Sequence, residues 1–155
     1  MRQNYAVGFA FNAEASKVVL IRKTRPAWQA GKLNGLGGKV DPGETPEHTM
    51  AREFFEECGV QTDPAEWHPF AKLASLDGDV ICYRLFDDKV MQARSCEDQE
   101  IVIVDTDMNL LAQQGMSSVV WLVGIALDTS QPHFFVEAQY NQEFKTGKMG
   151  TTTNG

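Results

Sequence analysis

The sequence predicts an α/β fold built as a single domain. Short strand-like segments occur before and after a helix whose two ends are clearly marked, and a second helix-like segment follows them. The chain has 155 residues, of which 43% are hydrophobic, so it can fill one core but has little left for a second. No internal repeat or long linker divides the chain.

The expected strands are runs of apolar and β-branched residues bounded by turn residues. The first two lie at residues 5–11 and 18–21, on either side of a polar turn. Later strands are expected at residues 70–73, 80–86, 100–104 and 133–140. Between the second strand and the first helix, residues 22–39 are rich in glycine and in basic side chains. We expect this segment to be a surface loop that can bind phosphate.

The clearest helix begins after Thr45 and ends before Gly59. Thr45 is a good N-cap, Pro46 suits the first helical position, and glycine is common just beyond a helix end. A second helix is expected at residues 117–127, which are almost entirely apolar.

Composition excludes several classes of partner. The formal net charge of −7 argues against nonspecific binding to duplex nucleic acid or to anionic membranes. The cysteines Cys58, Cys82 and Cys96 are odd in number and form no CxxC pair, so neither a disulfide framework nor a zinc site is expected. The N-terminal residues do not read as a signal peptide, and a cytoplasmic location is expected. Residues 145–155 are polar and are expected to form a flexible tail after a domain of residues 1–144.

Three carboxylates in the first helix carry the chemistry. Glu53, Glu56 and Glu57 are spaced i, i+3 and i+4, so they share one helix face. An acidic face can be no more than a solvated surface, but stacked anions are destabilising unless a cation lies between them. Hard oxygen ligands in this arrangement suit Mg²⁺ or Mn²⁺, which can also bridge phosphates.

A longer pattern surrounds these carboxylates. A glycine, five residues and a glutamate are followed by seven residues and then Arg-Glu-apolar-x-Glu-Glu-x-Gly-apolar, on Gly38, Glu44, Arg52, Glu53, Phe54, Glu56, Glu57, Gly59 and Val60. This pattern resembles the Nudix box at every defined position. The resemblance implies an α/β/α sandwich with a mixed sheet and a metal-dependent hydrolase that cleaves a pyrophosphate bond.

The resemblance also implies roles for individual residues. Glu53 is expected to act as the base or to orient the attacking water, and Arg52 to orient that carboxylate. The carbonyl of Gly38 is expected to be a metal ligand together with Glu53, Glu56 and Glu57, and Lys39 is expected to face the phosphates. Members of the family often recruit a further acidic residue from a later loop. The sequence offers Glu97, Asp98 and Glu100 for that role and does not choose among them.

The segment around the box is most similar to the MutT-like branch, which hydrolyses oxidised purine nucleoside triphosphates. Asn34 falls where a base-reading asparagine is expected, although an asparagine in a glycine-rich loop can also simply form a turn. Trp28 could stack on a base or cover the edge of the core. Arg25 and Lys32, together with the neighbouring Arg22 and Lys23, are candidate phosphate contacts. Leu33 stands where that branch often has tryptophan, and residues 116–121 offer only serines for reading a base.

The expected activity is therefore hydrolysis of a nucleoside triphosphate to a monophosphate and pyrophosphate. Two alternatives remain at this stage. One is a hydrolase of ADP-ribose, a dinucleoside polyphosphate or another nucleotide conjugate; the other is a nucleotide-sensing module without turnover. A nucleotide is the expected partner, and the chain is expected to be a monomer or a homodimer.

Overall fold

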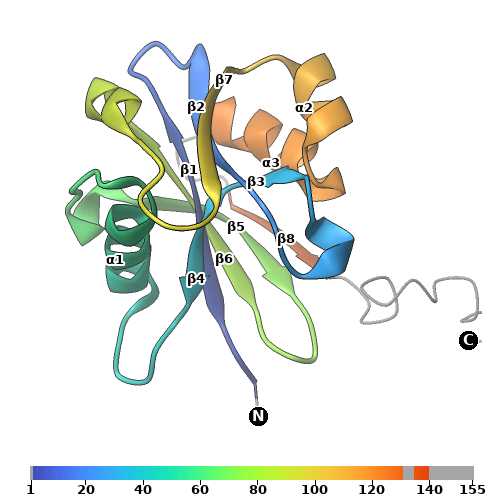
Figure 1. The fold of residues 1–155 in the computed structure, drawn as a ribbon. Helices are drawn as coiled ribbons and strands as arrows, with labels where there is room; N and C mark the ends of the chain where they lie inside the picture. The colour runs from blue at the N-terminus through green and yellow to red at the C-terminus, as the bar shows by residue number, and fades with distance from the viewer. Residues whose placement is uncertain (1, 131–134, 140–155) are drawn as a thin grey trace, which may run out of the picture.

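The computed structural model describes residues 2–130 and 135–139, and within them a mixed eight-stranded sheet forms the centre of the molecule (Figure 1). Its main strand order is β3-β2-β1-β6-β5-β8, with β4 paired to β1 and β7 paired to β2. The β1–β6 and β5–β8 pairs are parallel and the other pairs are antiparallel. The strands are β1 (Tyr5–Phe11), β2 (Lys17–Arg22), β3 (Leu33–Asn34), β4 (Leu36–Lys39), β5 (His68–Ala74), β6 (Val80–Phe86), β7 (Glu100–Asp105) and β8 (Val136–Gln139).

Helices cover both faces of this sheet, which makes the fold an α/β/α sandwich (Figure 1). Helix α1 (Pro46–Cys58) covers one face, and α2 (Met108–Gln114) and α3 (Ser117–Leu127) lie on the other. Short 3₁₀ helices occupy part of the connections: η1 (Ala27–Gln29), η2 (Pro64–Glu66) and η3 (Asp88–Gln92). The sandwich and the mixed sheet confirm the fold predicted from the sequence.

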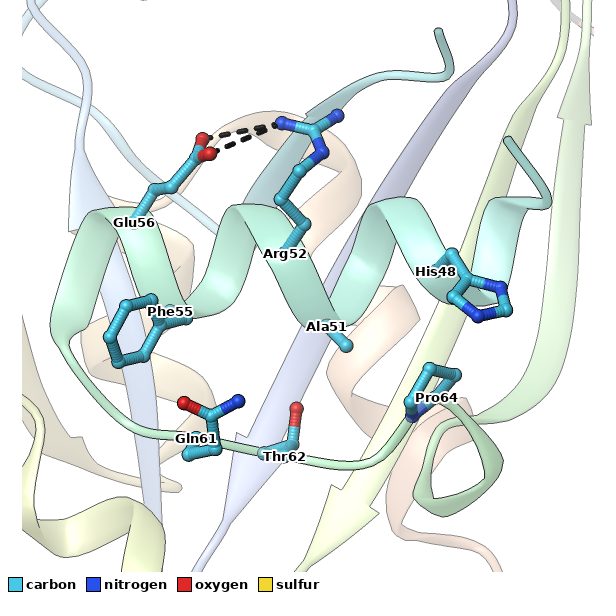
Figure 2. A pocket seen from close by; sticks show the side chains of 8 residues that line it. All are labelled: His48, Ala51, Arg52, Phe55, Glu56, Gln61, Thr62 and Pro64. Carbon is cyan, nitrogen blue, oxygen red and sulfur yellow. Dashed lines mark hydrogen bonds and ion pairs between the residues drawn. The ribbon is translucent and has the colours of Figure 1, made fainter. Parts of the chain in front are cut away.

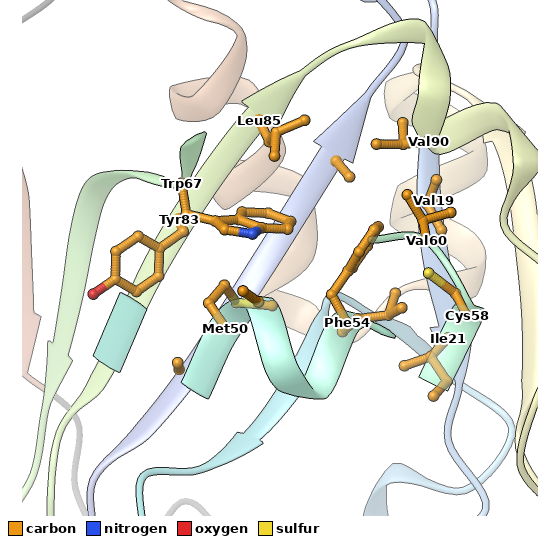
Figure 3. Packing of buried hydrophobic residues seen from close by; sticks show 14 residues of the cluster. Val19, Ile21, Met50, Phe54, Cys58, Val60, Trp67, Tyr83, Leu85 and Val90 are labelled. Carbon is orange, nitrogen blue, oxygen red and sulfur yellow. The ribbon is translucent and has the colours of Figure 1, made fainter. Parts of the chain in front are cut away.

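The core consists of two layers because successive strand residues point to opposite faces of the sheet. In β2, Val19 and Ile21 pack toward α1, whereas Val18 and Leu20 pack toward α3. Figure 3 shows the first layer, in which Phe54 of α1 meets the indole of Trp67 edge to face with ring centroids 5.1 Å apart. The sheet is thus buried on both faces, and the apolar side of α1 packs against one of them.

The ends of α1 are those that the sequence predicted. The hydroxyl of Thr45 accepts a hydrogen bond from the backbone N–H of His48 at 3.2 Å, and Pro46 is the first helical residue. Gly59 ends the helix with a φ of +80°, which favours glycine. Met50, Phe54 and Cys58 are buried on the side that faces the sheet, so the carboxylates lie on the remaining surface.

Several other expectations hold with small changes of boundary. The strand at residues 80–86 and the helix at residues 117–127 have the predicted limits, and residues 136–139 form the described part of the strand expected at 133–140. Cys58 and Cys82 are buried free thiols, and Cys96 is a free thiol on the surface. The expected tail at residues 145–155 lies outside the described residues. Among the described residues, no helix has both the length and the apolar character needed to span a bilayer.

The sequence reading was wrong about the glycine-rich segment. Residues 33–34 and 36–39 were expected to be part of a loop, but they form β3 and β4. The physical reason is that both pair through their backbones, β3 with β2 and β4 with β1, and backbone pairing does not require the side-chain signals on which a strand prediction rests. The short helix α2 was not expected either; Asp107 caps it, and Leu111 is its one buried residue.

Candidate active site

Glycines in β4 allow this strand to lie directly against the acidic side of α1. Gly37 has a φ of +153°, which favours glycine, and a β-carbon there would collide with the carbonyl oxygen of Ala6. A β-carbon at Gly38 would overlap the carboxylate of Glu53. The backbone N–H of Gly37 donates a hydrogen bond to Oε1 of Glu57 at 3.0 Å. Two of the three carboxylates therefore meet the glycine strand with no side chain between them.

Arg52 links the acidic side of α1 to the loop that precedes the helix. Its Nε and Nη2 atoms donate to the two oxygens of Glu44 at 2.7 and 2.9 Å, and the hydroxyl of Thr49 donates to the same carboxylate at 2.7 Å. These hydrogen bonds lower the pKa of Glu44 to about 2. The Nη1 atom of Arg52 lies 3.3 Å from an oxygen of Glu53 and 3.3 Å from one of Glu56; Figure 2 shows the contact with Glu56. Glu44 thus fixes the guanidinium of Arg52, and this guanidinium in turn contacts the carboxylates of Glu53 and Glu56.

Burial raises the pKa of two of these carboxyls. Glu57 is only 8% exposed, and the loss of hydration raises its pKa to about 8, with repulsion from Glu53 and Glu97 adding to the rise and Lys23 opposing it. Burial is also the main cause of a raised pKa at Glu53, where Arg52 is the main opposing influence. Both groups would hold their charge more readily beside a cation.

The loop before β7 is attached to the end of α1. The backbone N–H groups of Arg94 and Cys96 donate to the carbonyls of Cys58 and Glu57, at 3.0 and 3.2 Å. The next residue, Glu97, lies close enough to raise the pKa of the acidic groups at the site.

The two other acidic residues of this loop have basic partners. Asp98 lies 3.3 Å from the guanidinium of Arg25, and Glu100 lies 3.1 Å from that of Arg22. Neither is among the causes of the raised pKa values of the acidic groups on α1. Of the three candidates from the sequence, Glu97 is therefore the one whose charge reaches the carboxylates of α1.

A pocket of about 770 Å³ adjoins these carboxylates. Gly37 and Gly38 belong to its wall, and Lys23 and Lys39 supply positive charge there. The remaining walls come from η1, β3, the first half of β1, the start of β6, the ends of β5 and β8, and the start of α3. The pocket is large enough for a nucleotide, and its glycine wall is shared with the acidic site.

The structure places the predicted substrate residues in two groups. Trp28, Asn34 and Lys39 line the pocket. Arg25 and Lys32 are exposed residues outside its lining, and Arg25 is paired with Asp98 as described above. Their proposed contacts with phosphate remain predictions.

The sequence reading missed Trp121 as a pocket residue. It lies in the apolar helix expected at residues 117–127, where the sequence assigns it no role at the site, yet it is 40% exposed and lines the pocket. A signal was present: the buried positions of α3 are Val119, Leu122, Val123 and Ala126, a stripe at helical spacing that leaves Trp121 outside it.

A second, shallower pocket of about 340 Å³ lies on the outer side of α1 (Figure 2). His48, Phe55 and Pro64 line it, and Arg52 and Glu56 form one edge. Neither the glycines of β4 nor Glu53 and Glu57 take part in it, so we do not assign the reaction to this groove.

The donors available for a metal are oxygens of Glu53, Glu56 and Glu57, with the backbone carbonyl of Gly38. Among the described residues, no three His, Cys, Asp or Glu side chains are already gathered as metal ligands. Glu56 is turned to Arg52, and Glu57 accepts the N–H of Gly37. The donor set nevertheless fits a hard divalent cation, which would also offset the repulsion that helps to raise the pKa of Glu53 and Glu57.

The fold and this site define a class of α/β/α protein in which a helix that carries carboxylates lies against a glycine strand beside a ligand pocket. The family profile described as NUDIX domain matches residues 1–114. The chain therefore belongs to the Nudix family.

Several curated relatives match parts of the chain. The 8-oxo-dGTP diphosphatase of Escherichia coli K12 is 40% identical over 68 residues, which cover 44% of this chain and 50% of that protein. The oxidized purine nucleoside triphosphate hydrolase of Danio rerio is 47% identical over 45 residues, 29% of each chain. The alignments thus span half or less of the length of these relatives.

Solved structures match the fold over a greater length. A MutT structure from a study of the Aliivibrio salmonicida and Vibrio cholerae proteins has a TM-score of 0.63 at 24% identity and covers 79% of this chain and 97% of that one. A NUDIX hydrolase from Nitrosomonas europaea has a TM-score of 0.65 at 12% identity and covers 91% and 80%. At these identities the likeness shows the fold.

Proposed function

We propose that this chain is a metal-dependent nucleotide pyrophosphohydrolase that converts a nucleoside triphosphate to a monophosphate and pyrophosphate. The observation that carries the proposal is the shared wall at Gly37 and Gly38, which belongs both to the pocket and to the acidic site. A nucleotide in the pocket would present its phosphates to a place with carboxylates and two lysines. The activities named for the Escherichia coli and Danio rerio relatives, on 8-oxo-dGTP and on oxidised purine nucleoside triphosphates, agree with this assignment.

Glu53, Glu56, Glu57 and the carbonyl of Gly38 would hold Mg²⁺ or Mn²⁺. When bound, such an ion neutralises charge on the phosphate oxygens and lowers the pKa of a bound water. The sequence pattern and the hard oxygen donors support this assignment, as does the raised pKa of Glu53 and Glu57.

The residues of the chain divide the remaining work. Glu53 accepts the proton of the attacking water, and its raised pKa makes it a stronger base than an exposed glutamate. Arg52 holds this carboxylate in place, since its guanidinium is fixed by Glu44. Lys39 and Lys23 contact phosphate oxygens from the wall of the pocket. Glu97 contributes a further carboxylate from the later loop.

Substrate profiling tests the proposal. The purified protein is incubated with Mg²⁺ and either a panel of nucleoside triphosphates or ADP-ribose, and pyrophosphate and AMP are measured. We expect pyrophosphate from triphosphates and no activity in excess chelator. If the protein releases AMP from ADP-ribose and hydrolyses no triphosphate, it belongs with the nucleotide-conjugate hydrolases. If it binds nucleotides without turnover, it is a sensor.

A further inference from the structure

Two half-exposed indoles line the pocket. Trp28 lies in η1 and is 49% exposed, whereas Trp121 lies in α3 and is 40% exposed. Neither is a member of the two core clusters, unlike Trp67, which is 2% exposed. An indole left in water gains apolar contact when an aromatic ring stacks on it, so both side chains are suited to hold a flat heterocycle.

The amide of Asn34, which the sequence suggested for reading a base, is already engaged within the protein. Its Oδ1 atom accepts the backbone N–H of Gly35 at 2.8 Å, and its Nδ2 atom donates to Sδ of Met116 at 3.2 Å. An asparagine reads a purine edge by offering a donor and an acceptor together. Here each of the two groups already makes one hydrogen bond within the protein, and the amide cannot turn toward a base edge without breaking both.

The other polar groups of the pocket adapt to more than one base. No carboxylate lines it among the described residues. Ser117 and Ser118 offer hydroxyls, which can rotate to donate or to accept. The amides of Gln29 and Gln139 are carried on long flexible side chains. None of these groups imposes one fixed pattern of donors and acceptors.

We infer that this site binds the base of its nucleotide by stacking on Trp28 and Trp121 and does not read the base edge. The substrate class is then purine nucleotides in general, with similar affinity for guanine, 8-oxoguanine and adenine. This inference rests on the proposed function, since it takes the pocket to be the nucleotide site. Pyrimidines bind more weakly because their smaller rings cover less of the two indoles.

Calorimetric titration with the products tests base recognition without turnover. The probes are dGMP, 8-oxo-dGMP, dAMP and dCMP. We expect the three purines to agree within about tenfold in Kd, and dCMP to bind more weakly than all of them. Trp28→Ala and Trp121→Ala should each weaken purine binding by about tenfold or more, in line with the usual contribution of base stacking.

Conservative variants separate stacking from folding. Trp28→Phe and Trp121→Phe retain an aromatic face and should keep most of the affinity. Asn34→Ala and Ser118→Ala change the same pocket without removing an aromatic face, and should alter each Kd by less than about threefold.

Three results would overturn the inference. The first is an affinity for one purine that is about 100-fold or more above that for the others, together with loss of this preference in Asn34→Ala or Ser118→Ala. Such a result is expected of a site that reads a base edge by hydrogen bonds. The second is unchanged purine binding in both alanine variants of the tryptophans. The third is a failure of all four monophosphates to bind.

Turnover reports separately on the proposed function: a chain that binds purines in the expected manner but hydrolyses no triphosphate would disprove the activity and leave base recognition standing.

Discussion

Glu53 lies where α1, the glycine strand and Arg52 meet, and the prediction at this residue concerns rate. Glu53→Gln keeps the size of the side chain and its contact with Arg52, but it removes the base and weakens one proposed metal ligand, so the kinetics are measured at saturating Mg²⁺. We expect kcat to fall by about 10²–10⁴-fold with KM nearly unchanged, since general-base catalysis contributes about that much. Steady-state kinetics of the folded variant, checked by its melting temperature, measures this. An unchanged kcat would move the role of base to the later acidic loop.

That later loop supports a second prediction. Burial is the main cause of the raised pKa of Glu53 and Glu57, and among the acidic residues of the later loop Glu97 is the one whose charge adds to it. Asp98 and Glu100 are paired with arginines. We expect Glu97→Gln to lower kcat/KM by about tenfold or more. Asp98→Asn and Glu100→Gln are matched controls and should lower it by less than about threefold, since exposed ion pairs contribute little. A larger loss in either control than in Glu97→Gln would reverse the assignment.

At this scale the sequence could predict the carboxylates of α1 but not the choice within the later loop. Spacing alone puts Glu53, Glu56 and Glu57 on one side of a helix. Which later acidic residue approaches them depends on two backbone hydrogen bonds to the end of α1, at Arg94 and Cys96, and no local pattern in the sequence encodes those.

For helix α1 as an element, the crowding of carboxylates predicts a dependence of stability on pH. In the metal-free protein the pKa of Glu57 is about 8, well above its ordinary value of 4.5. The folded state therefore binds a proton more tightly than the unfolded state, and this contribution to stability is fully present below about pH 4.5 and is lost as the pH rises through about 8. Glu57→Gln is neutral at every pH and can still accept the N–H of Gly37. We expect this variant to melt at a higher temperature than the unmodified chain at pH 9, and the gap to shrink toward pH 5.

Thermal melts in excess chelator at pH 5, 7 and 9 measure this gap. Glu56→Gln is the control, because the Glu56 side chain is 45% exposed and its carboxylate is paired with Arg52. It should show no gain that grows with pH. Both variants should stay folded and lose most of their turnover with Mg²⁺, since each removes a proposed ligand. A difference in melting temperature between Glu57→Gln and the unmodified chain that is the same at all three pH values would contradict the raised pKa of Glu57.

The elements differ in how far the sequence could predict them. The N-cap and the terminal glycine of α1 are local signals, so Thr45 and Gly59 marked its ends correctly. Strands β3 and β4 exist because their backbones pair with β2 and β1, and a glycine-rich segment carries no side-chain pattern that announces such pairing.

For the whole molecule, the pocket depends on the sandwich. Trp28 lies in η1, shortly before the glycine strand β4, whereas Trp121 lies in α3, far away in the sequence. The fold brings both to one pocket. The sequence could predict Trp28 as a candidate, because it stands in a basic, glycine-rich segment. Helical spacing could place Trp121 outside the buried stripe of α3, but it could not show that this side of the helix faces the pocket, because that depends on how α3 packs on the sheet.

The arrangement of the whole site leads to a prediction about the bond that is cleaved. In the proposed function, the pocket brings phosphates to carboxylates and to lysines. The proposed site residues include no serine or cysteine nucleophile paired with histidine. We therefore expect direct attack of water on a phosphorus of the pyrophosphate linkage, without a covalent intermediate.

Hydrolysis of a triphosphate in ¹⁸O-water should place one solvent oxygen in one of the two products, as mass spectrometry of both would report. Label in the monophosphate marks attack at the α-phosphorus, and label in pyrophosphate marks attack at the β-phosphorus. Release of inorganic phosphate with a diphosphate left behind would contradict the pyrophosphohydrolase assignment, because the bond broken would then be the outer one.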